Sequence, residues 1–242
     1  MLRLAMLDTE ILMLYLSRIL FINLLFLLLL SRIESSLRGT LNMNKASSLC
    51  KSLVICGPSG VGKSTLVGRL LKEFPNKFGL SVSHTSRKPR AGELDGVHYH
   101  FISKDDILND IKNGAHPYIE HAEVHANIYG TRSDSVDKVH QDGKICLIDI
   151  DRRGVMQVKK SGLSAKYLFI APLSMELLAD RLKGRGTETE EQLALRLHNA
   201  KEEIDYGLAT GNFDAIVTND ELDKAYNDLL GHARNWFPFL HI

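Results

Sequence analysis

The sequence predicts an α/β protein with a mostly parallel β-sheet, and three observations lead to this prediction. From Lys51 onward, short apolar runs alternate with amphipathic stretches of helical period, which is typical of strand–helix–strand units. Between Lys144 and Asp149 the chain is continuously apolar and ends in an acid, as a buried parallel strand should. A glycine-rich turn joins the apolar run 52–56 to a helical stretch. We therefore expect parallel strands connected by helices that cover the sheet.

The individual elements follow from the same patterns. Ser174 is expected to cap a helix, because a serine hydroxyl accepts hydrogen bonds from the free N–H groups at a helix start. A short helix is expected near 104–113, inside a mixed region, 99–124, with strands on either side. The expected main strands are 52–56, 80–83, 144–149, 165–170 and 215–218. The expected helices are 63–73, 104–113, 133–142, 174–183, 190–206 and one that begins at 222.

The composition is ordinary for a soluble protein. The chain has 242 residues, of which 24% are charged and 44% hydrophobic, and its formal net charge is +1. Such a chain suits one or two domains, and its charge gives no electrostatic argument for a nucleic-acid partner. The cysteines Cys50, Cys56 and Cys146 show no metal-ligand spacing. They favour a reducing compartment.

A hydrophobic segment, 11–30, stands apart from the rest of the chain. It just reaches the ~20 residues needed to span a bilayer, but Arg18 near its middle costs roughly 2.5–3.5 kcal/mol there. Asp8 and Glu10 occupy the flank where a targeting sequence carries basic residues. Three interpretations stay open: a signal anchor or targeting segment, a dispensable extension before a functional start at Met43, and an amphipathic or partner-binding segment. We expect residues 1–50 to be a leader and linker, and residues 51–242 to form the functional domain.

The turn after the first strand has the sequence of a phosphate-binding loop. Residues 57–64 read Gly-Pro-Ser-Gly-Val-Gly-Lys-Ser and fit G-x-x-x-x-G-K-S, with an apolar strand before them and a helix after them. Such a loop directs backbone N–H groups at phosphate oxygens beside a helix N-terminus. Lys63 is expected to reach the β- and γ-phosphates of a nucleoside triphosphate, and the Ser64 hydroxyl to bind Mg²⁺. An ordinary glycine-rich turn is the alternative.

Two further features fit a site that handles phosphate. Asp149 ends the apolar strand and is the expected acidic partner of the metal, with a solvated strand-end aspartate as the alternative. In the basic loop 83–93, Arg87 and Arg90 lie three residues apart beside Pro89. Because arginine can bind phosphate through two parallel hydrogen bonds, the loop suits a monophosphate. A solvated basic loop is the alternative.

Seven further motifs follow in order along the chain. They are S-x-T-x-R-x-P-R-x-G-E at 83–93, D-G-x-x-Y-x-F at 95–101, I-E-x-A-x-V at 119–124, Y-G-T at 129–131, D-I-D at 149–151, R-L-x-G-R-G-T at 181–187 and N-D-x-L-D-K-A at 219–225. With these motifs the chain resembles the guanylate kinases from about residue 52 to residue 230. The resemblance implies a three-layer P-loop NTPase fold, with a small mixed β GMP-binding subdomain at about 83–132 and a helical lid at about 181–196. It also implies transfer of the γ-phosphoryl group of ATP to GMP, giving ADP and GDP, with Mg²⁺ as cofactor.

The resemblance implies roles for single residues. A carboxylate at Glu120 would accept from the N1–H and N2–H₂ donors of guanine, which adenine lacks, and so reject AMP. The arginines of the lid would neutralise charge on the transferring phosphoryl group. The implied catalytic residues are Lys63, Arg87, Arg181, Arg185 and Arg196. The implied ATP-binding residues are Gly57, Pro58, Ser59, Gly60, Val61, Gly62, Lys63, Ser64, Thr65 and Asn219. The implied GMP-binding residues are Ser83, Arg87, Arg90, Tyr99, Glu120, Tyr129, Thr131 and Asp151, and the implied metal ligands are Ser64 and Asp149.

Five positions depart from the usual residues of the family: His121, Ala126, Ile128, Arg152 and Arg153. The two arginines replace an uncharged pair and place two charges near the expected GMP pocket. They leave every residue with an implied chemical role in place.

Two other functions stay open. A scaffold that binds phosphopeptides in the former GMP site is disfavoured by the intact loop and Lys63, and a P-loop kinase for another phosphorylated acceptor is the third candidate. The expected partners are ATP and GMP, with dGMP left open, no nucleic acid, and a membrane only through residues 11–30. We expect a monomer in the cytosol, with a membrane-anchored or organelle-targeted form as the alternative.

Overall fold

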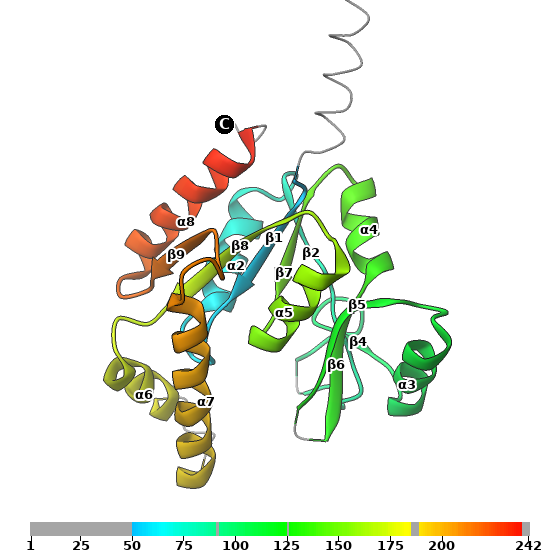
Figure 1. Cartoon of the computed structure of the whole chain (residues 1–242), viewed down its shortest axis with the longest axis horizontal. Coiled ribbons are helices and arrows are strands. Elements are labelled where there is room, and N and C mark those ends of the chain that lie inside the picture. The colour runs from blue at the N-terminus through cyan, green and yellow to red at the C-terminus, as the bar shows by residue number, and fades with distance from the viewer. Residues whose placement is uncertain (1–49, 91, 125, 185–188, 239–242) are drawn as a thin grey trace, which may run out of the picture. The chain divides into compact units, whose positions relative to one another are not determined.

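The computed structural model describes residues 50–90, 92–124, 126–184 and 189–238, and Figure 1 shows how their helices and strands are arranged. The predicted leader up to residue 49, including the hydrophobic segment 11–30, lies outside the described residues. So does Arg185 of the predicted lid. None of the helices in the described ranges has the length and apolar character required to span a bilayer.

A parallel sheet of five strands, in the order β2-β7-β1-β8-β9, forms the centre of the unit that begins at Cys50 (Figure 1). Every pairing in this sheet is parallel. The central strand β1 is buried along its whole length. The strands are β1 (Ser52–Cys56), β2 (Phe78–Leu80), β7 (Ile145–Asp149), β8 (Ala165–Ala171) and β9 (Ala215–Thr218). The predicted mostly parallel α/β sheet is confirmed.

Helices cover both faces of this sheet, as expected for three layers. Alternate side chains of β1 point to opposite faces, so Leu53 and Ile55 pack with residues of α2 and α8 in one core. Val54 and Cys56 pack with residues of α4 and α5 in a second core. The helices are α2 (Lys63–Glu73), α4 (Ser133–Gln141), α5 (Arg152–Ser161), α6 (Met175–Lys183), α7 (Glu190–Leu208) and α8 (Leu222–Trp236).

A second, smaller sheet of mixed direction has the strand order β4-β3-β6-β5. Its pairing of β3 with β4 is parallel, and the pairings of β6 with β3 and β5 are antiparallel. The elements are β3 (His84–Thr85), β4 (His100–Phe101), α3 (Lys104–Asn113), β5 (Tyr118–Val124) and β6 (Asn127–Arg132). The predicted small mixed sheet in the region 83–132 is therefore present.

The prediction of a strand at 80–83 was wrong. The strand β2 instead covers Phe78–Leu80 and pairs with β7. After Ser81, whose N–H still donates to the Leu147 carbonyl oxygen at 2.9 Å, the chain leaves the large sheet. It joins the small sheet at His84, which pairs with Gly130 and His100. The polar residues of this stretch carry the chain between the two sheets.

Helix α5 was not predicted from the sequence. The Asp151 carboxylate caps it by accepting a hydrogen bond from the Gly154 N–H at 2.8 Å. The helix ends before Gly162, whose φ is +79°. Only Gly154, Val155 and Val158 are buried on it, and the rest of the helix is mostly polar or basic, so it lacks the apolar content by which the other helices were predicted. The predicted cap of α6 is confirmed, since the Ser174 hydroxyl accepts from the Leu177 N–H at 3.2 Å.

Candidate active site

The glycine-rich loop connects β1 to α2, as the sequence predicts. Gly62 precedes the helix with a φ of +101°, and a side chain there would overlap the amide of Asn219. That Asn219 amide donates to the Val61 carbonyl oxygen at 2.7 Å. The first turn of α2 follows with Ser64 and Thr65 exposed. The loop is therefore held in shape by a buried asparagine from the end of β9, while the start of the helix faces solvent.

Lys63 lies against the loop from which it projects. Its ammonium group donates to the carbonyl oxygens of Gly57 and Pro58. Asp149, at the end of β7, stands beside β1 in register with Ile55. The Asp149 side chain lines the cavity described below. Burial raises the pKa of its carboxyl above the ordinary value, and the positive charge of Lys63 opposes this rise. Lys63 and Asp149 therefore lie close enough for their charges to interact.

On the small sheet, Glu120 of β5 pairs directly with Thr131 of β6. Glu120 is only 6% exposed and Thr131 is fully buried. Burial raises the pKa of the Glu120 carboxyl to about 7, a rise that hydrogen bonds from Thr131 oppose and the nearby Asp151 carboxylate increases. The Thr131 hydroxyl also lies 3.2 Å from the Ser83 hydroxyl. The buried Glu120 carboxylate and the hydroxyls of Thr131 and Ser83 thus lie close together.

Arg87 is held rigidly by its neighbours. Its two terminal nitrogens donate to the two carboxylate oxygens of Glu93, each at 2.9 Å. Its Nε–H donates to the Tyr129 hydroxyl at 3.2 Å. The Tyr99 ring lies 5.9 Å from the Tyr129 ring, and the Arg87 guanidinium is 5.4 Å from the centre of the Tyr99 ring. The Arg90 side chain is exposed, and its backbone N–H donates to Glu93 at 2.7 Å.

Two predicted lid residues donate hydrogen bonds to the loop or to the segment that follows β9. Arg196 of α7 donates to the Ser59 hydroxyl at 2.9 Å. Arg181 of α6 donates to the backbone carbonyl oxygens of Asn219 and Asp220, at 2.9 and 3.1 Å. Arg181 therefore ties α6 to the end of β9 in this arrangement, and its role over a triphosphate stays a prediction.

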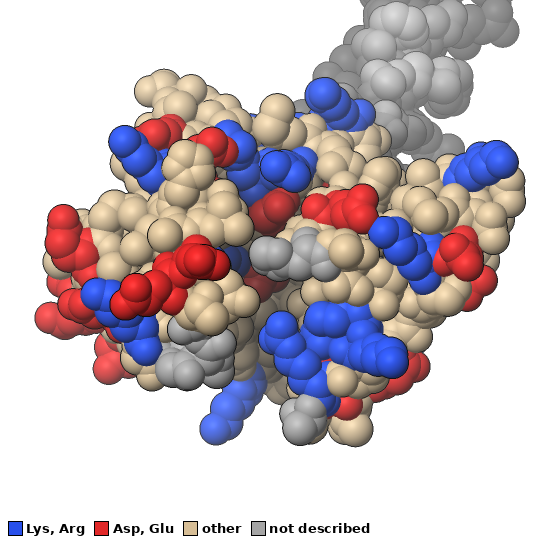
Figure 2. Space-filling view, turned by 90° about the horizontal axis from the view of Figure 1, so that it is seen from below, with Lys and Arg blue, Asp and Glu red and all other residues tan. Residues whose placement is uncertain are grey.

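One cavity of about 620 Å³ is lined by seven of the predicted site residues. Figure 2 shows a groove in the face that it views, with basic side chains gathered on one side. The cavity is bounded by the loop, the small sheet, the start of α5 and the middle of α7. The predicted residues that line it are Ser59, Ser83, Tyr99, Glu120, Tyr129, Asp149 and Asp151. Others reach it through a neighbour: Arg87 through Tyr129, Thr131 through Ser83, and Arg196 through Ser59.

Comparisons with known proteins show the family of this chain. A family model described as guanylate kinase matches residues 50–233. The chain belongs to the guanylate kinase family. Guanylate kinase 1 of Arabidopsis thaliana is 51% identical over 179 residues, which are 74% of this chain and 46% of that relative. Guanylate kinase of Schizosaccharomyces pombe is 47% identical over 179 residues, 74% of this chain and 88% of that relative.

A solved structure has the same fold. The crystal structure of guanylate kinase from Anaplasma phagocytophilum matches with a TM-score of 0.59 at 28% identity, over 78% of this chain and 86% of that one. The match with the two plant relatives, from Arabidopsis thaliana and Oryza sativa, spans only 46% and 52% of their length. This chain therefore corresponds to about half of those longer members of the guanylate kinase family.

Three carboxylates at this site were not predicted from the sequence. Glu93 orients Arg87, and its position three residues after Arg90 in a basic loop was the available signal. Glu203 lines the cavity from α7, and burial raises the pKa of its carboxyl to about 7. Glu203 follows Arg196 by seven residues, so the two share one face of the helix. Glu202 also lines the cavity, where it pairs with Arg152.

Proposed function

We propose that this chain is a guanylate kinase, which transfers the γ-phosphoryl group of ATP to GMP and gives ADP and GDP. The observation that carries the proposal is one cavity that is lined both by Ser59 of the phosphate-binding loop and by the buried Glu120, which pairs with Thr131 across the small sheet. The carboxylate can accept from the N1–H and N2–H₂ groups of guanine while a hydroxyl donates to O6. Adenine and uracil do not match this arrangement of donors and acceptors.

The phosphate of the acceptor nucleotide would lie against the basic loop. Arg87 and Tyr129 supply N–H and O–H donors on one side, and Ser83 and Tyr99 line the same cavity. Because Glu93 and Tyr129 fix the guanidinium, less side-chain entropy is lost when Arg87 binds phosphate. Arg90 is exposed beside it and would add a second fork. This set positions the attacking phosphate oxygen.

The triphosphate of the donor would lie in the loop 57–64, because a loop of this sequence presents backbone N–H groups to phosphate oxygens. Lys63, Arg196, Arg181 and Arg185 would neutralise charge on the transferring group, which needs positioning and charge stabilisation more than a protein nucleophile. Asn219 supports the loop from behind through Val61. Closing of the lid over the cavity would exclude water and so limit hydrolysis of ATP.

The residues present fit a magnesium ion. Ser64 and Asp149 offer oxygen ligands near the loop, and within the described ranges no group of three or more His, Cys, Asp or Glu side chains forms a closed metal site. Mg²⁺ bound with a nucleotide takes only one or two protein oxygens besides water and phosphate. When bound, the ion would neutralise charge on the β- and γ-phosphates.

The proposal is tested by measuring ADP release from ATP and Mg²⁺ with GMP, dGMP, AMP or UMP as acceptor. We expect turnover with GMP and none above background with AMP or UMP. Turnover that does not depend on GMP, or a preference for AMP or UMP, would contradict the proposal. The monomeric state and cytosolic location stay predictions, to be checked by light scattering and by imaging of the full chain.

A further inference from the structure

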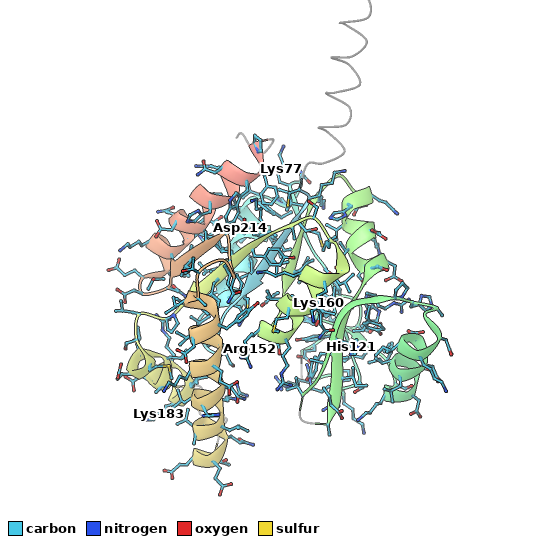
Figure 3. The ribbon with its side chains drawn as sticks, in the orientation of Figure 1. Lys77, His121, Arg152, Lys160, Lys183 and Asp214 are labelled. Carbon is cyan, nitrogen blue, oxygen red and sulfur yellow. The ribbon has the colours of Figure 1, made fainter. Side chains whose placement is uncertain are left out.

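An ion pair joins the two sides of the cavity. Arg152, the first residue of α5, donates through Nη2 to Glu202 Oε2 of α7 at 2.9 Å. Both side chains line the cavity, and Figure 3 shows Arg152 beside α7. Arg152 directly follows Asp151, whose carboxylate caps α5 and lies near Glu120. The pair therefore links the proposed guanine pocket to the helix of the proposed lid.

The same helix also touches the phosphate-binding loop. Arg196 of α7 donates to the Ser59 hydroxyl at 2.9 Å. Arg196 and Glu202 lie six residues apart, which is about 9 Å along a helix axis. Both residues belong to one continuous helix, α7, which begins with a capping box formed by Thr189 and Gln192. A movement of α5 relative to α7 would therefore affect both the Arg152–Glu202 ion pair and the Arg196–Ser59 hydrogen bond.

The Arg152–Glu202 ion pair is partly exposed and lies among other charged groups. Glu202 Oε1 lies 3.8 Å from His198 Nε2, and Arg152 lowers the otherwise raised pKa of Glu203. The side chains of Arg152 and Glu202 are 31% and 51% exposed. Ion pairs this exposed contribute little to the stability of a fold. Their geometry, however, depends on the distance between α5 and α7.

We propose that Arg152 and Glu202 are positioning residues that couple binding of GMP to the placement of Arg196 at the ATP side. The proposal rests on the proposed function, because it takes the acceptor pocket and the loop as the two nucleotide sites. GMP held at Asp151 would fix the start of α5, and the ion pair would then fix α7. By thermodynamic linkage, GMP should raise the affinity for an ATP analogue, and the analogue should raise the affinity for GMP by the same factor.

The test measures this factor by calorimetry in the full chain. A non-hydrolysable ATP analogue is titrated with Mg²⁺, with and without GMP, into the unmodified chain and into Arg152→Gln, Glu202→Gln and the double variant. We expect each single substitution to lower the factor about two- to fivefold, the range for one partly exposed ion pair. The double variant should lose no more than either single one, because both remove the same interaction.

A second ion pair provides the control. Lys166 and Asp214 also pair at 2.9 Å, with 35% and 31% exposure, and in Figure 3 Asp214 lies well apart from Arg152. Lys166→Gln should leave the factor unchanged. All variants should melt within about 2 °C of the unmodified chain, because single surface pairs add little stability.

Three results would overturn the proposal: a factor of one in the unmodified chain, a factor unchanged by the single substitutions, or losses that add in the double variant. An equal loss in Lys166→Gln would also overturn it, because the effect would then not depend on the cavity. The binding measurement needs no turnover. An unmodified chain that shows the coupling but forms no ADP with GMP would refute the phosphoryl transfer and leave the coupling intact.

Discussion

Replacing Glu120 by glutamine tests two effects of the buried carboxylate: its destabilisation of the fold and its proposed recognition of the acceptor nucleotide. The carboxyl has a pKa of about 7 in the folded chain, against an ordinary 4.5, mainly because it is buried. The folded chain therefore holds this proton more tightly than the unfolded chain. The stability that results is complete below pH 4.5 and is lost as the pH rises through 7.

The size of this loss follows from the shift. One pKa unit corresponds to 1.36 kcal/mol, so the ionised Glu120 carboxylate costs the fold roughly 3 kcal/mol at pH 8. Glutamine keeps the shape and one acceptor for Thr131 but carries no charge. We expect Glu120→Gln to raise the free energy of unfolding at pH 8 by up to roughly 3 kcal/mol, and to change it little at pH 4.5. Glu203 has a similarly raised pKa, but it is present in both chains and its effect cancels.

The same substitution should damage acceptor recognition. A glutamine NH₂ group would face guanine donors that the carboxylate accepts from, so kcat/KM for GMP should fall at least about 100-fold, as when a site loses a bonded polar partner. Urea denaturation at pH 4.5 and pH 8 measures the first effect, and ADP release measures the second. Glu123→Gln, on the same strand but 61% exposed, is the control for stability. A Glu120→Gln chain less stable than the unmodified one at pH 8, or one with full activity on GMP, would refute the reasoning.

Three other substitutions test other parts of the molecule. Lys63→Ala should lower kcat at least about 100-fold without lowering the melting temperature, since it removes charge stabilisation of the transferring group; an active variant would contradict this. Gly62→Ala should cost roughly 1–3 kcal/mol of stability, because its φ is +101° and its side chain would overlap Asn219. The control Gly68→Ala, in an open helix position, should be neutral or stabilising. His84→Asn should reduce the loss of unfolding free energy between pH 6.5 and pH 4. Burial and a stacked histidine lower the pKa of His84 to about 4 from 6.5, so the unmodified chain loses stability as pH falls from 6.5 to 4, which urea denaturation across that range would show.

Most elements of the large sheet could be predicted, in their order along the chain, because they have strong local signals. Strand β7 is continuously apolar, and the loop 57–64 fixes a strand before it and a helix after it. The two errors, in β2 and α5, occurred where the apolar pattern in the sequence is short or narrow. Strand β2 has only three residues, and α5 buries a narrow stripe beside polar and basic residues. In both places tertiary packing decides the structure rather than propensity.

Site residues could be predicted where one residue type in a fixed pattern has one chemical use, as with Lys63. Pairings between distant segments could not be found in this way. Nothing in the sequence states that Arg152 meets Glu202, fifty residues later, or that Arg181 meets backbone carbonyls beyond β9. Such contacts depend on how α5, α6 and α7 pack, and a sequence pattern carries no distance between helices.

The environment of Arg87 shows what this difference means for function. The sequence predicts that this arginine binds phosphate, and in the structure its two terminal nitrogens already donate to the Glu93 carboxylate. That bond lowers the pKa of Glu93 to about 2. An unpaired arginine would be free to rotate, and ordering it on binding would cost affinity. Glu93 and Tyr129 instead hold the guanidinium at the edge of the cavity, from two sides. An incoming phosphate would therefore meet an oriented cation and would have to share or displace a carboxylate. Since Glu93 is a negative charge, that exchange would make Arg87 more selective for a dianionic phosphate than for a neutral group of similar size.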